Sequence, residues 1–135
     1  ERCELAEYVV HLPVSLFGRN PMLSGKALDF LVLHAKFSLG TDASEGALHS
    51  LEDFSRNCLN QRCPLDVLNR ILDGFDYLGR FSQAHTSYPS QGLRVELDQA
   101  VQHKLSTLNP GTPEIVALES RWQNLTSRWA NANAA

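Results

Sequence analysis

The chain has 135 residues, enough to close one hydrophobic core, and its 43% hydrophobic and 20% charged residues are typical of a folded domain. A net charge of −3 and a pI of about 5.9 exclude a uniformly basic nucleic-acid coat, so any nucleic-acid role requires a local basic patch. No run of 18 apolar residues is present, which argues against a membrane-spanning helix.

The cysteines indicate a cytoplasmic protein. Cys3, Cys58 and Cys63 are an odd set without the spacing of a disulfide framework, so we expect free thiols in a reducing compartment. The sequence starts at Glu1 without a signal-like segment, and we expect a processed chain or a piece of a longer one. A zinc site of His49, Cys58 and Cys63 is an alternative that lacks a fourth ligand, and we expect no cofactor.

The first quarter of the chain predicts an extended segment followed by a helix. Residues 5–17 mix β-branched and aromatic side chains, as strands do. Ser24 is a suitable N-cap for a helix over residues 24–39, and Gly40 is expected to end that helix.

The next segment predicts two helices joined by a turn. Ser50, followed three residues later by Asp53, resembles a capping box and predicts a short helix over residues 50–58. A second helix over residues 64–78 has apolar side chains at intervals of three and four residues, namely Leu65, Leu68, Ile71, Leu72 and Phe75. Gly74 interrupts this helix and weakens it by up to about 1 kcal/mol relative to Ala.

Residues 80–97 predict a β-hairpin. The segment Arg80–Gln83 is a short strand, residues 84–92 form a polar tip, and Leu93–Leu97 alternate between apolar and charged side chains. We expect Gly79 to end the preceding helix in a backbone conformation that suits glycine.

Two further helical segments complete the chain. Residues 97–108 predict a short helix, and Thr112 and Pro113 open a C-terminal amphipathic helix within residues 110–135. Its apolar face includes Trp122, Leu125 and Trp129. Two uses of this face remain open: it completes the core, or it binds a second copy or another domain.

The order of these elements resembles a winged helix-turn-helix domain, an α+β fold that is mainly α. The resemblance rests on the stretch SLEDFSRNCLNQRCPLDVLNRILDGFDYLGRF, in which a capped helix, a turn and a second helix lead into the wing, residues 80–97. The preceding stretch, residues 11–39, is similar to the opening of MarR-like regulators and of plasmid or phage replication-initiator modules. The winged-helix domain would span residues 1–109.

The resemblance implies binding of double-stranded DNA in replication initiation or transcription regulation, with helix 64–78 in the major groove and the wing on the backbone. Side chains of the types that contact bases or phosphates are Arg56, Gln61, Arg62, Asn69, Arg70, Arg80, His85, Thr86 and Arg94. Asp66 and Asp73 lie on the same helix and depart from this pattern.

The alternative is a protein–protein interaction or dimerisation module that does not bind DNA. It is favoured by the acidic balance and by the Trp-bearing face, and its partners would be a second copy or other domains of a longer chain. We expect no enzyme activity, because the five His are scattered and no nucleophile elbow, phosphate-binding loop or metal-binding helix motif is present.

Overall fold

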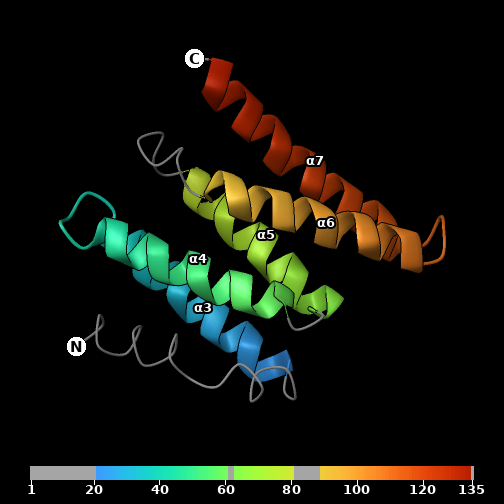
Figure 1. The fold of residues 1–135 in the computed structure, drawn as a ribbon, viewed down its shortest axis with the longest axis horizontal. Helices are drawn as coiled ribbons and strands as arrows, with labels where there is room; N and C mark the ends of the chain where they lie inside the picture. The colour runs from blue at the N-terminus through green and yellow to red at the C-terminus, as the bar shows by residue number, and fades with distance from the viewer. Residues whose placement is uncertain (1–20, 61–62, 81–88, 135) are drawn as a thin grey trace.

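A computed structural model describes residues 21–60, 63–80 and 89–134, and these residues form five α-helices (Figure 1). The helices are α3 (Pro21–Ser38), α4 (Ser44–Asn60), α5 (Leu65–Gly79), α6 (Gln91–Thr107) and α7 (Pro113–Ala134). The described residues include no β-strand, so the prediction of an α+β winged helix is wrong. No helix among them is long and apolar enough to cross a membrane.

Helix α5 is the centre of the arrangement. It packs extensively against α3 and α7, which lie on opposite sides of it, and less closely against α4 and α6 (Figure 1). Helix α3 also packs along α4, and α6 bridges α4 and α7. The central position of α5 explains its long apolar face, whose buried residues are Val67, Leu68, Ile71, Leu72, Gly74, Phe75 and Leu78.

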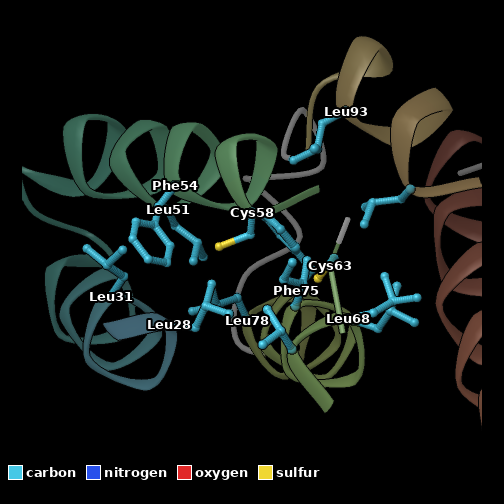
Figure 2. Close-up of a cluster of buried hydrophobic side chains, with 14 of the residues drawn as sticks. Leu28, Leu31, Leu51, Phe54, Cys58, Cys63, Leu68, Phe75, Leu78 and Leu93 are labelled. Carbon is cyan, nitrogen blue, oxygen red and sulfur yellow. The ribbon is translucent and has the colours of Figure 1, made fainter. Parts of the chain in front are cut away.

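One hydrophobic cluster joins all five helices. Figure 2 shows its central part, to which α3, α4, α5 and α6 contribute side chains, among them Leu28, Leu51, Leu68 and Leu93. Leu118 and Leu125 of α7 are members of the same cluster. The buried apolar residues recur at intervals of three and four along each helix, the spacing that places them on one helix face.

The predicted wing does not form. Arg80 is the C-cap of α5, Ser90 is the N-cap of α6, and the predicted second strand, residues 93–97, lies within the first half of α6. The predicted short helix, residues 97–108, is the rest of the same helix. Residues 81–88, which include most of the predicted hairpin tip, lie outside the described residues.

The alternation in residues 93–97 fits a helix as well as a strand. Leu93 and Leu97 are four residues apart and therefore share one helix face, on which both are fully buried, while Val95 lies on the opposite, exposed face. Val101 continues the buried face four residues later. The longer window, from Leu93 to Val101, distinguishes the helical period from the strand period.

Helix boundaries differ from the prediction mainly at the N-terminal ends. Helix α3 begins at Pro21 rather than Ser24, a first-turn position that suits proline because its missing N–H would have no partner. Helix α4 begins at Ser44 rather than Ser50, after a turn in which the Thr41 hydroxyl accepts a hydrogen bond from the Ala43 N–H. The polar stretch before residue 50 is therefore largely helical.

Two glycines adopt left-handed backbone conformations in the connections. Gly40 follows α3 with a φ of 80°, and Gly111 precedes α7 with a φ of 82°, so both connections need residues that tolerate this region. Gly79 does not share this role. It is the last residue of α5, and a Cβ there would lie 2.9 Å from Cδ of Arg128 on α7.

Gly74 allows α5 to approach α3. A Cβ at this position would lie 2.6 Å from Cγ2 of Val32, far closer than two carbon atoms can pack. Val32 has a stiff β-branched side chain and cannot easily move aside. The glycine that weakens α5 as an isolated helix is thus required by the packing of α5 against α3.

We predict that Gly74→Ala destabilises the protein by about 1–3 kcal/mol, because overpacking at Val32 outweighs the gain in helix propensity. The matched control is Gly46→Ala on α4, where no atom lies within 4 Å of the added Cβ. This control should be neutral or stabilising by up to about 1 kcal/mol. Urea denaturation of both variants measures the difference.

The double variant Gly74→Ala/Val32→Ala tests whether the destabilisation comes from the clash with Val32 or from some other effect of the added methyl group. It should be less destabilised than the sum of the two single variants, because truncation of Val32 removes the atom that clashes. Additive free energies would contradict the proposed contact.

Candidate functional site

The residues predicted to contact DNA fall into three groups. Gln61, Arg62, His85 and Thr86 lie outside the described residues. Arg56, Arg70 and Arg80 form ion pairs with carboxylates. The remaining two, Asn69 and Arg94, are half-buried.

The ion pairs of these arginines join different helices as well as turns of one helix. Arg70 of α5 lies 2.6 Å from Asp29 of α3 and 3.3 Å from Asp66. Arg80 lies 3.0 Å from Asp76, one turn earlier on α5. Each carboxylate offsets the charge that a phosphate would otherwise attract.

Two further arginines on α7 repeat this arrangement. Arg121 lies 3.0 Å from Asp73, and Arg128 lies 3.0 Å from Asp76, so α7 is tied to α5 by two ion pairs. Asp73, which departs from the winged-helix pattern, is therefore a partner of α7. Exposed pairs of this kind contribute about 0–1 kcal/mol each, but they reduce the positive charge available to a ligand.

Helix α5 is covered on two sides, by α3 and by α7 (Figure 1). Two of its exposed residues, Asp66 and Asp73, are acidic. Asn69 is half-buried, and its Oδ1 is shielded from solvent without a hydrogen-bond partner among the described residues. This side of α5 presents carboxylates rather than base-reading amides.

Arg94 and the tryptophans connect α6 to α7. The guanidinium of Arg94 donates a hydrogen bond to the Pro89 carbonyl and lies over the Trp129 ring, 4.6 Å from its centroid. Burial lowers the pKa of Arg94 from its usual value. The Trp129 ring makes an edge-to-face contact with Trp122, with centroids 5.7 Å apart.

The predicted interaction face of the C-terminal helix is therefore turned largely inward. Leu125 is fully buried in the core, and Trp122 and Trp129 are half-buried and pack against it. Of the two uses that the sequence left open, completing the core accounts for these contacts.

A buried carboxylate, Glu52 of α4, holds the start of α6. Its side chain is only 5% exposed, and it accepts hydrogen bonds from the Ser90 backbone N–H at 3.0 Å and from the Ser90 hydroxyl at 2.5 Å. The same hydroxyl accepts from the Leu93 N–H and so caps α6. A negative charge at a helix N-terminus is favourable, because the helix dipole is positive there.

Arg56, which is half-buried, completes the group around Glu52. It donates to Glu96 at 2.8 Å and to the Ser90 hydroxyl at 3.4 Å, and it lies 3.5 Å from Glu52. The hydrogen bond to Glu96, followed by the nearby carboxylates, raises the pKa of Arg56. Arg56, predicted to contact phosphate, instead joins α4 to the first two turns of α6.

A cleft of about 670 Å³ lies between α6 and three residues of α4, α5 and the segment before α5. Its apolar wall is formed by Leu59, Cys63 and Leu68. The facing wall belongs to α6 and consists of four polar residues and one alanine, namely Glu96, Gln99, Ala100, His103 and Lys104. This cleft was not predicted from the sequence. The signal that could have found it is the helical period of α6, which places residues 96, 99, 100, 103 and 104 on adjoining faces.

The cysteines of the described residues are buried and reduced. Burial raises the pKa of both Cys58 and Cys63 to about 12, and Lys104 partly opposes this at Cys63. Such thiols are poor nucleophiles at neutral pH.

The zinc alternative finds no support in this part of the chain. Among the described residues, no group of three or more His, Cys, Asp or Glu side chains is placed to hold a metal ion. His49 lies on the surface, 3.3 Å from Asp53.

Comparisons with protein-family models, with curated proteins and with solved structures find no match to this chain. The function therefore has to be inferred from the chain's own residues.

We predict that Glu52→Gln destabilises the protein by about 1.5–3 kcal/mol, because an amide cannot accept from both donors of Ser90 without placing its own N–H group against one of them. The control is Glu45→Gln, an exposed residue of the first turn of α4, which should cost a few tenths of a kcal/mol at most. Urea denaturation measures both. A double-mutant cycle with Ser90→Ala should show coupling, and additive effects would contradict the contact.

We predict that alkylation of Cys58 and Cys63 by iodoacetamide accelerates about tenfold per pH unit from pH 7 to 10, whereas free glutathione levels off near its own pKa. The folded pKa is raised above the ordinary value of 9.0, so the stability contributed by the neutral thiols is present below pH 9 and is lost as pH rises toward 12. Peptide-level mass spectrometry measures the rates, and a plateau below pH 9 would contradict this assignment.

Proposed function

We propose that this chain is a protein-interaction module that binds an amphipathic helix of a partner protein along the exposed face of α3. The observation that supports this is a stripe of four residues, Lys26, Phe30, Leu33 and Phe37, at intervals of four, three and four. These intervals place the four side chains on one helix face.

The stripe exposes apolar area that the core does not use. Leu33 is 49% exposed and Phe37 is 61% exposed, while Phe30 is half-buried beside them. Neighbouring apolar side chains at helical spacing are the usual anchors for a helix that lies in a groove or along a second helix.

Charge indicates what the partner helix carries. Lys26 is exposed at one end of the stripe. Lys36 lies next to the other end, with its ammonium 5.5 Å from the centroid of the Phe37 ring. A partner helix with acidic residues flanking its apolar face would complement Lys26. A second copy of α3 would bring the same lysines without matching acids from within the stripe.

The distribution of arginines also favours a protein partner over DNA. Arg56, Arg70, Arg80, Arg121 and Arg128 all contact carboxylates, in a chain whose net charge is −3. Binding to double-stranded DNA derives most of its affinity from phosphates that meet unpaired positive charge. DNA binding stays a prediction from the sequence, to be tested alongside.

The test uses two fluorescent helical peptides with identical leucine faces, one flanked by Glu and the other by Lys. We predict that the Glu peptide binds at least tenfold more tightly, and that Leu33→Glu weakens its binding at least tenfold by placing a charge in the stripe. Fluorescence anisotropy measures both affinities. The matched control is Val116→Glu on α7, a residue 61% exposed and outside the stripe, which should leave binding within twofold.

Two results would overturn the proposal. Equal loss in Leu33→Glu and Val116→Glu would show that the peptide does not use α3. Binding of a mixed-sequence DNA duplex that weakens steeply between 50 and 200 mM salt, without binding of either peptide, would instead support the DNA hypothesis. Sedimentation of wild type and Leu33→Glu shows whether a second copy occupies the stripe.

A further inference from the structure

The cleft beside α6 has the size and composition of a small-molecule site. Its volume of about 670 Å³ lies within the range of about 300–1,000 Å³ that ligand pockets occupy. Leu59 and Cys63 supply an apolar wall, and Gln99, His103 and Lys104 supply polar groups on the facing wall. An apolar wall with a few polar groups opposite it suits a ligand that is itself amphipathic.

The charges of the polar wall indicate the sign of that ligand. Glu96 accepts a hydrogen bond from Arg56 at 2.8 Å, and the same guanidinium lies 3.5 Å from the buried Glu52, so Glu96 is already held by a cation that it shares. Lys104 has no carboxylate within 4.0 Å among the described residues and is half-buried at the cleft. Lys104 is therefore the charged residue of the lining that has no ion-pair partner among the described residues, and the imidazole of His103 is a neighbouring hydrogen-bond donor.

We propose that this cleft binds a small organic anion, a carboxylate with an apolar body. The apolar body lies against Leu59 and Cys63, and the carboxylate accepts hydrogen bonds from Lys104 and from Gln99 or His103. An ammonium–carboxylate hydrogen bond at a half-buried site is stronger than one in open solvent.

The cleft is distinct from the interaction stripe of α3. Its lining comes from α4, residue 63, α5 and α6, and none of the four stripe residues is part of it. Ligand binding here goes beyond the proposed interaction function, and either one can fail without affecting the other.

The test compares three probes of equal chain length: octanoate, octylammonium and 1-octanol. Titration calorimetry on the full chain should show saturable octanoate binding, at least tenfold tighter than octylammonium and tighter than 1-octanol. Lys104→Met keeps much of the length and apolar stem of the side chain but removes its charge, and should weaken octanoate at least fivefold. The control Arg80→Met removes an exposed cation outside both the cleft and the α3 stripe and should leave affinity within twofold.

Cys63 provides a second readout at the cleft wall. Bound octanoate should slow alkylation of Cys63, which lines the cleft, by at least threefold, and leave alkylation of Cys58, which does not line it, unchanged. Peptide-level mass spectrometry separates the two thiols in one sample. This readout uses the wild-type chain and does not depend on whether a variant folds.

The following results would overturn the proposal. Equal binding of octanoate and octylammonium would show that Lys104 does not select the ligand, and so would unchanged affinity in Lys104→Met. Absence of octanoate binding by the wild type at 10 mM, or equal slowing of Cys58 and Cys63, would show that the cleft is not the site.

Discussion

The hydrogen bonds from Ser90 to the buried Glu52 carboxylate fix how the second half of the chain meets the first. Helix α6 begins at Gln91, and Ser90, its N-cap, makes both of these hydrogen bonds. Glu52 holds the first turn of α6 on α4, and Arg56 extends the contact to Glu96 one turn further. The cleft beside α6 and the contact of α6 with α7 both follow from this placement.

The sequence predicts a helix or strand correctly where its spacing of apolar residues extends over a long enough segment. Residues 65–78 contain seven apolar side chains besides Tyr77, at a helical spacing that no strand accommodates, and the predicted bounds of α5 are within one residue at each end. Residues 93–97 cover only five positions. Apolar residues at the first and last of five positions fit both the two-residue period of a strand and the 3.6-residue period of a helix. Ser90, a capping residue three positions before Leu93, was assigned to a hairpin tip because its helical role depends on the longer window.

The candidate site was less predictable, because the partner of a charged side chain is set by tertiary structure. Asp66 lies four residues from Arg70, and that contact can be anticipated from the sequence. Asp29 lies 41 residues from Arg70 and is the closer partner, which depends on how α3 crosses α5. The residue types in the sequence therefore suggested a basic surface, whereas the helix packing pairs those residues with acids. The cleft likewise combines distant segments: the helical period of α6 groups its polar wall, but the apolar wall comes from residues more than 25 positions earlier.

The central place of α5 has a consequence for the growing chain on the ribosome. The contacts of α3 with α4 and with α5 are between elements that follow one another, so they can form once residue 79 has emerged. The side of α5 that α7 covers stays uncovered until Pro113 and the following residues have been synthesised. During that interval the nascent chain exposes part of the apolar face of its central helix, a surface to which a chaperone can bind.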